Sequence, residues 1–212
     1  MIGERILNPQ ELPPYDFLME RVLGKTRNNV DQDQVERLMA LISYHETGGT
    51  MEPFTIQKSN LYDEKEEVIG SKEGPGRGLY QYELETLGGS GAGRTAMNNL
   101  LIAYGGEVDP RGAYDKLPKW AKKYFNINNP SHYPNPEGDV DFSELTEEQQ
   151  KILFLADKLE DPKVKLADIG VLADHEWWAK YHHKGADPNV QKFSNDAARY
   201  LKGEFRKLHN IE

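Results

Sequence analysis

Apolar residues recur at helical spacing in the first third of the chain, within the segment 31–46. The positions that share one helix face are Val35, Leu38, Met39 and Ile42. Glu46 continues this face, Asp31 or Asp33 can cap the N-terminus, and Gly48-Gly49 can end the helix. The pattern therefore predicts a helix that carries a carboxylate at the end of an apolar face.

The same spacing, interrupted by glycine and proline, predicts the other helices. They cover residues 15–23, 94–104 and 120–125, a segment that begins at Thr146, and the stretches 174–184 and 188–207. Gln149 follows Thr146 by three residues, which is the pattern of a capping box. The glycine-rich residues 50–78 predict either a loop or a small β-hairpin, and the proline-rich residues 106–142 predict an ordered loop region. We therefore expect a mainly α fold with little sheet.

Composition narrows the classes of function. The 26 lysines and arginines and the 35 aspartates and glutamates give a net charge of −9. A nucleic-acid partner is disfavoured, because the phosphate backbone selects clustered Lys and Arg. The chain has no cysteine, which excludes disulfides, thiolate nucleophiles and cysteine-based zinc sites.

Targeting signals are not evident in the chain. Residues 1–9 lack a basic segment followed by an apolar run, so we expect no Sec-type signal peptide. No stretch is long and apolar enough to predict a membrane span. We expect one domain over residues 1–212, with its core at about 30–205, a monomer made in a cytoplasm and without a membrane partner.

Glu46 is the first candidate for chemistry. It lies in the run Ser43-Tyr44-His45-Glu46-Thr47-Gly48-Gly49, where a sharp turn after the helix would place its carboxyl at the lip of a cleft. Burial there should raise its pKa, as a general acid requires, and glycosidic cleavage needs such a proton donor. By position alone, a structural Glu that faces solvent is an equally good interpretation.

Two later motifs could contact a sugar. In Gly76-Arg77-Gly78-Leu79-Tyr80-Gln81, glycines let the backbone approach a ligand, and Gln81 can donate and accept hydrogen bonds. In the segment 177–185, aromatic faces could stack on sugar rings, although we expect Trp177 and Trp178 in the core. The nearby histidines, His175, His182 and His183, lack a recognised zinc spacing, so we expect neither a metal site nor a cofactor.

In this order the motifs resemble the lysozyme superfamily, specifically its lytic transglycosylase and goose-type lysozyme branch. That branch has a helix ending in a catalytic Glu-Ser, then a Gly-Leu-Met-Gln turn and a later Tyr-Asn-Ala-Gly. The corresponding segments are Glu46-Thr47, Gly78-Leu79-Tyr80-Gln81 and, with one extra residue, Tyr181-His182-His183-Lys184-Gly185.

The resemblance implies a lysozyme-like α+β fold with a small β-hairpin or glycine-rich loop and a helical C-terminal part. It implies that Glu46 is the catalytic acid, that Gln81 contacts substrate, and that Tyr181 is a hydrogen-bond partner of Glu46. Further candidate substrate contacts beside these motifs are Tyr44, His45 and Tyr80.

The chain also resembles plant-type (family-nineteen) chitinases, which carry His-Glu-Thr and a later Gly-Arg-Gly before a Gln. Those enzymes use a second Glu from the intervening loop, where Glu64, Glu66 and Glu67 lie. Two mechanisms therefore stay open. Glu46 acts alone, with the N-acetyl or 6-hydroxyl group of the sugar completing the reaction, or a second carboxylate activates water.

The first resemblance implies a peptidoglycan-degrading enzyme that cleaves between N-acetylmuramic acid and N-acetylglucosamine. Its partner would be the glycan strand. The expected absence of an export signal and the absence of cysteine suit a bacteriophage lysin. Such a protein acts from the host cytoplasm on the cell wall or periplasm, or is carried in the virion. The rival class is a non-catalytic wall-binding or virion protein that keeps the lysozyme fold, since a fold does not guarantee activity.

Overall fold

Helices form most of the chain, as its apolar periodicity predicts. The computed structural model describes residues 12–27, 29–126, 128, 136–183 and 188–208. In these ranges the α-helices are α1 (Pro14–Lys25), α2 (Gln32–Glu46), α3 (Ala92–Ala103), α4 (Pro110–Lys116), α5 (Lys119–Lys122), α6 (Glu147–Glu160), α7 (Asp174–Trp178) and α8 (Val190–Leu208). Short 3₁₀ turns cover Glu85–Leu87, Phe142–Glu144 and Leu166–Asp168, and a π-helical turn, Ala179–His183, follows α7. The expectation of a mainly α fold with a small β region is confirmed.

Side-chain caps begin two of the longest helices. At α2 the Asp31 carboxylate accepts from the Gln34 amide at 2.9 Å, and the Gln34 side chain accepts from the Asp31 amide at 3.0 Å. Thr146 and Gln149 form the same reciprocal pair at α6, with distances of 3.3 and 3.1 Å. Asp31, rather than Asp33, is therefore the cap of α2, and the predicted capping box at Thr146 is confirmed.

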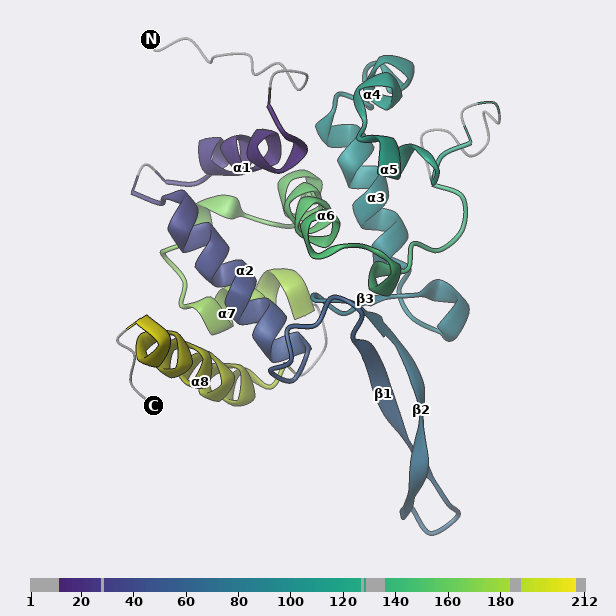
Figure 1. Cartoon of the computed structure of the whole chain (residues 1–212), viewed down its shortest axis with the longest axis vertical. Helices are drawn as coiled ribbons and strands as arrows, with labels where there is room; N and C mark the ends of the chain where they lie inside the picture. Colours follow the sequence, from purple (N-terminus) through teal and green to yellow (C-terminus); the bar gives the residue numbers. More distant parts are fainter. Residues whose placement is uncertain (1–11, 28, 127, 129–135, 184–187, 209–212) are drawn as a thin grey trace.

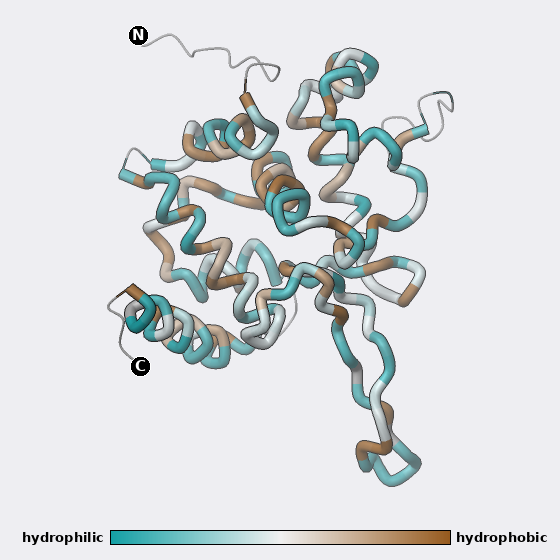
Figure 2. Tube along the Cα trace, viewed as in Figure 1, coloured by the Kyte–Doolittle hydropathy of each residue, from teal (hydrophilic) through white to brown (hydrophobic). Residues whose placement is uncertain are grey.

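Helix α6 lies in the middle of the helical body, with α1 and α3 packed against it (Figure 1). Its apolar side chains are buried, and the trace of α6 carries brown, hydrophobic segments in Figure 2. Each fully buried leucine of this kind contributes roughly 1.5–3 kcal/mol. The polar side chains Gln150, Asp157 and Lys158 of α6 are buried as well.

A three-stranded antiparallel sheet, β1–β2–β3, adjoins the helical body. Strand β1 (Ile56–Tyr62) pairs with β2 (Val68–Arg77), and β2 pairs at its end with the short β3 (Tyr82–Glu83). The β1–β2 hairpin projects from the body, and its base lies beside the end of α2 (Figure 1). Residues 50–78, predicted as a loop or a hairpin, therefore include a hairpin.

Two predicted boundaries need correction. The proline-rich residues 106–142 contain the helix α4 as well as the expected short helix, α5, which ends at Lys122 and not at 125 as predicted. Pro110 occupies the first turn of α4, where its missing N–H has no helical partner to lose, and Asp109 caps the Gly112 amide at 2.9 Å. The helix predicted over 174–184 ends at Trp178 and continues as the π-helical turn, and its predicted end at 184 lies outside the described residues.

None of the helices in the described part of the chain is both long and apolar enough to cross a bilayer.

Candidate active site

Glu46 is the last residue of α2, and the turn after it is tightly fixed. The Thr47 hydroxyl donates to the Ser43 carbonyl at 2.7 Å and accepts from the Met51 amide at 2.9 Å. Gly49 has φ of +93°, and a Cβ there would lie 3.2 Å from the Tyr44 ring, so this position favours glycine. The backbone around Glu46 therefore holds its carboxyl in one place.

The Glu46 side chain is 17% exposed. Its carboxyl accepts one hydrogen bond and has a histidine nearby. The indole Nε1 of Trp178 donates to Glu46 Oε1 at 2.7 Å, and His182 Nε2 lies 3.7 Å from the same oxygen. Burial raises the pKa of Glu46 from 4.5 to about 7, although the hydrogen bond from Trp178 and the charges of Lys192 and Lys158 oppose the rise. A carboxyl with this pKa can still carry a proton at neutral pH, as a general acid must.

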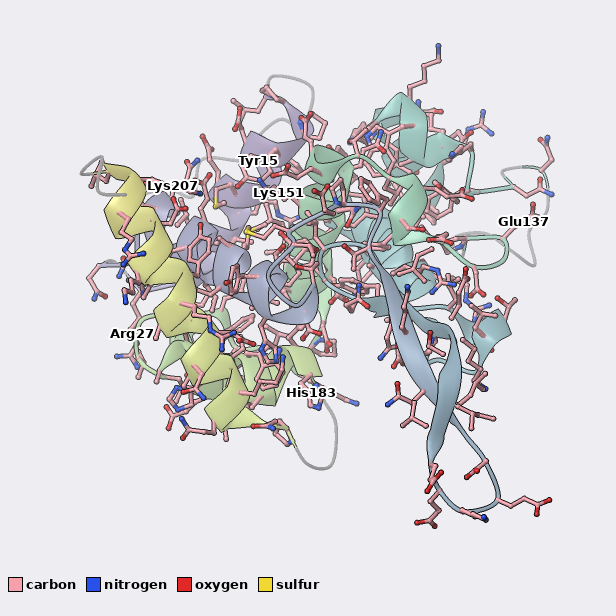
Figure 3. The ribbon with its side chains drawn as sticks, turned by 60° about the horizontal axis from the view of Figure 1, so that its bottom comes forward. Tyr15, Arg27, Glu137, Lys151, His183 and Lys207 are labelled. Carbon is pink, nitrogen blue, oxygen red and sulfur yellow. The ribbon has the colours of Figure 1, made fainter. Side chains whose placement is uncertain are left out.

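Glu46 lies on the wall of a cleft of about 550 Å³, between the helical body and the base of the hairpin. Most of the other lining groups are polar or aromatic: Gln57, Tyr80, Gln81, Tyr82, Glu83, Ser90, Ala92, Thr95, Asp157, Lys158, His182 and His183. His183, labelled in Figure 3, lies at the end of the π-helical turn. Amides, hydroxyls and aromatic faces are the groups that hold a sugar chain.

Gln81 reaches the cleft because the turn before it is anchored to α6. Gly78 has φ of +71°, and a Cβ on it would lie 2.3 Å from Gln150 Oε1. The buried Gln150 accepts from the Leu79 amide at 2.7 Å and donates to the carbonyl of Pro53 at 2.7 Å. The Gln81 amide itself donates to the Gly78 carbonyl at 2.7 Å, which fixes its side chain against the turn.

A buried ion pair from α6 contributes to the lining of the cleft. Lys158 Nζ is 2.8 Å from Asp157 Oδ2 and 3.2 Å from the Tyr181 carbonyl, and its side chain is 3% exposed. Asp157 also accepts from the Tyr82 hydroxyl at 2.8 Å and from Asn99 Nδ2 at 3.2 Å. A buried charge pair needs such additional hydrogen bonds, because desolvation otherwise outweighs the attraction. Lys158 brings a fixed positive charge to the site of Glu46.

The hydrogen bond predicted between Tyr181 and Glu46 is wrong. The Tyr181 hydroxyl donates to Asp168 Oδ2, and Trp178 takes the expected place beside Glu46. Trp178 is the last residue of α7, whereas Tyr181 lies in the π-helical turn that follows it.

The other candidate contacts divide between the cleft and the core. Tyr80 and Gln81 line the cleft, whereas Tyr44 and His45 do not. The His45 ring is buried against α8, with Nδ1 2.8 Å from Asp196 Oδ2, and the Tyr44 ring lies 5.5 Å from that of Tyr200. Adjacent residues of a helix point in different directions, so Glu46 can face the cleft while these two neighbours pack on α8.

The three glutamates considered as a second carboxylate lie away from the cleft. Glu64, Glu66 and Glu67 are exposed in the turn that joins β1 and β2, at the outer end of the hairpin, and none lines the cleft (Figure 1). Glu83, on β3, does line it. The Ser90 amide donates to Glu83 Oε2 at 3.0 Å, which holds this carboxylate in the wall.

Sequence reasoning missed Trp178, Glu83 and Lys158 as members of this site. The expectation that Trp177 and Trp178 are core residues is confirmed, since both are 2% exposed. Yet Trp178 meets Glu46 across 132 residues of sequence, and no local pattern carries that information. The charged Asp157-Lys158 pair on an otherwise apolar face of α6 was the one available signal.

Among the described residues, no group of three or more His, Asp or Glu side chains is arranged to hold a metal ion. Comparison of the chain with protein-family models, with curated proteins and with solved structures gives no match.

Proposed function

We propose that the protein is a glycosidase of the bacterial cell wall, which cleaves between N-acetylmuramic acid and N-acetylglucosamine with Glu46 as its general acid. The observation that carries the proposal is a carboxyl with a pKa of about 7 on the wall of a cleft of about 550 Å³. An ordinary surface glutamate is ionised at neutral pH and has no proton to give to a leaving oxygen.

Glu46 would protonate the glycosidic oxygen as the bond to C1 breaks. Positive charge then develops at C1, and a nucleophile must complete the reaction. In the single-acid route, the 6-hydroxyl of the same sugar bonds to C1 and returns its proton to Glu46, which leaves a 1,6-anhydro end. The motif resemblance to lytic transglycosylases supports this route.

The position of Glu83 supports a second route at the same site, in which two carboxylates act together. It is held in the cleft wall by the Ser90 amide, and its charge raises the pKa of Glu46, so the two carboxyls interact. Glu83 would take a proton from water while the water oxygen bonds to C1, which gives an ordinary reducing end. This residue replaces Glu64, Glu66 and Glu67 as the proposed partner.

Glu46→Gln tests the proposal, because the amide keeps the shape and the acceptor for Trp178 but has no acidic proton. We expect soluble fragments released from purified peptidoglycan to fall by about 10²–10⁴-fold, the usual contribution of a general acid. Circular dichroism should show an unchanged fold. Equal release by both proteins would contradict the role of Glu46. Absence of release by the unmodified protein would favour the non-catalytic wall-binding or virion protein.

Glu83→Gln and product analysis separate the two routes. In the single-acid route the variant keeps most activity and the products carry 1,6-anhydro ends. In the two-carboxylate route the variant loses activity and the unmodified protein gives reducing ends. Purified chitin as a parallel substrate tests the specificity for the cell-wall glycan.

A further inference from the structure

A second and larger groove, of about 1010 Å³, lies between α1, α2, the start of α6 and the C-terminal half of α8. Tyr15 and Lys151 are two of its lining residues, and Figure 3 shows their labels together near α1. Tyr80 lines both this groove and the cleft that holds Glu46. The two hollows are otherwise lined by different residues, so the groove is a separate feature of the molecule.

The groove has an apolar floor. Its accessible apolar surface comes from partly buried or exposed side chains of α1, α2, α8 and the loop after α2: Tyr15, Ala40, Met51, Tyr200 and Leu201, the last of which is 46% exposed. Ser43 is 2% exposed and lines the groove, and its Oγ has no hydrogen-bond partner among the described residues. Neighbouring side chains cover this hydroxyl, so recognition of a ligand falls to the apolar floor and the charged rim.

The rim of the groove is strongly acidic. Its carboxylates are Asp16, Asp33, Glu36, Glu147, Glu148 and Glu204, and its cations are Arg37 and Lys151. Lys151 pairs with Glu147 inside the groove, whereas Arg37 pairs with Asp174, which is not part of it. Asp16, Asp33 and Glu148 have no ion-pair partner within the part of the chain that the structure describes.

Helix dipoles account for only part of this charge. Asp16, Asp33 and Glu148 lie in the first turns of α1, α2 and α6, where a carboxylate is stabilised by the positive end of the helix. Each helix end supplies roughly half a positive charge, so three ends offset about 1.5 of the rim's excess negative charge. The convergence of the three helices therefore leaves a groove that attracts cations.

We propose that this groove binds a basic amphipathic segment of a partner protein. The apolar side of the segment covers the floor, and its Lys and Arg side chains face the acidic rim. Anionic partners such as nucleic acid or an acidic lipid surface are repelled by the rim. A second copy of the chain that offers this same face is repelled as well.

The proposal can be tested with a synthetic helical peptide that has Leu on one face and Lys on the other. The peptide is labelled with fluorescein. We expect binding to the full-length protein by fluorescence anisotropy at low salt, and weaker binding to a peptide of the same composition with scrambled order. The triple variant Asp16→Asn, Asp33→Asn, Glu148→Gln should weaken binding by about tenfold, because three charge pairs are lost. Leu201→Ser, which alters one edge residue of the floor and no charge, should weaken it as well.

The matched control is the triple variant Glu64→Gln, Glu66→Gln, Glu67→Gln, which removes the same charge at the outer end of the hairpin. It should bind the peptide as the unmodified protein does. Absence of binding, equal binding of the scrambled peptide, or equal loss in both triple variants would overturn the proposal. A dimer in light scattering that the groove variants abolish would assign the groove to a second copy instead, and would overturn it too.

This inference stands apart from the proposed glycosidase activity. Glu46→Gln should bind the peptide normally, and the groove variants should cleave glycan normally if the unmodified protein does. Peptide binding and glycan cleavage are therefore separate measurements, and the failure of one proposal can be distinguished from the failure of the other.

Discussion

At the scale of single residues, the proton affinity of Glu46 is a balance between burial and its neighbours. Removal from water raises its pKa, and Glu83 adds to the rise. The Trp178 hydrogen bond and the charges of Lys192 and Lys158 favour the ionised form. Because these contributions oppose one another, removal of a single neighbour should shift the pKa without destroying the site.

Trp178→Phe isolates the hydrogen bond. The loss of a donor to the carboxylate should raise the pKa of Glu46, since the ionised form loses its partner. For a general acid, kcat/KM falls as pH rises through this pKa, near 7 in the unmodified protein. In the variant, the pH at which kcat/KM falls on the alkaline side should be higher by roughly one unit. Its maximum rate should be lower.

Trp177→Phe is the matched control for this experiment. Trp177 is equally buried, and its Nε1 has no hydrogen-bond partner among the described residues. The pH–rate profile of this variant should keep its limb near 7. An identical shift in both variants would mean that general loosening, rather than the hydrogen bond, moves the profile.

The sequence predicts the residues of the site only where the information is local. The periodicity of α2 places Glu46 at the end of a buried face, and the glycines around Gln81 indicate a tight turn. The partners of Glu46 come from far along the chain, since Trp178 is 132 residues away. Tyr181 was assigned to Glu46 by resemblance alone, and in the structure its hydroxyl donates to Asp168 instead.

At the scale of elements, the β1–β2 hairpin contributes residues to the wall of the cleft only at its base. Gln57, near its start, lines the cleft, whereas the outer part of β2 is exposed from Val68 to Glu73. Apolar Val68 and Ile69, at the start of β2, are 58% and 67% exposed, and Figure 2 shows brown segments near the outer end of the hairpin. The outer end is therefore not part of the proposed chemistry.

Removal of the negative charges at the outer end of the hairpin tests whether only its base takes part in the proposed chemistry. The triple variant Glu64→Gln, Glu66→Gln, Glu67→Gln should change glycan cleavage by less than about twofold, because exposed surface substitutions away from a site have small effects. Release of soluble peptidoglycan fragments measures the rate. A loss as large as that of Glu46→Gln would return the second carboxylate to this loop.

Element prediction from the sequence succeeded for the longer helices, missed the short helix α4 and was undecided for the sheet. A helix such as α2 or α6 has one buried face, which leaves a clear apolar period. Much of the hairpin is solvated on both faces, so it has no alternating pattern to distinguish it from a loop. The helix α4 was missed because proline indicates a break in general but is well accommodated in a first turn.

At the scale of the whole molecule, the site lies where elements from both ends of the chain meet. α2 supplies Glu46, α6 supplies Asp157 and Lys158, and the segment after α7 supplies His182. Folding therefore buries a carboxyl that the unfolded chain leaves in water. This burial links the proposed chemistry to the stability of the entire fold.

The link has a definite sign. The pKa of Glu46 rises from 4.5 in the unfolded chain to about 7 in the folded protein. Below pH 4.5 the carboxyl is protonated in both states and its burial has no ionisation cost. Between pH 4.5 and 7 the unfolded chain loses this proton while the folded protein keeps it, so the free energy of unfolding falls by up to about 3 kcal/mol across this range and is level above it.

Glu46→Gln should remove this pH dependence, since the amide does not ionise and can still accept the hydrogen bond from Trp178. We expect urea unfolding to give equal stabilities for variant and unmodified protein at pH 4, and a variant more stable by about 3 kcal/mol at pH 8. Glu66→Gln, at an exposed position, is the control. Its free energy of unfolding should change with pH in parallel with that of the unmodified protein. Parallel curves for Glu46→Gln as well would mean that Glu46 ionises as freely as a surface residue, and the raised pKa would have to be abandoned as the basis of its role.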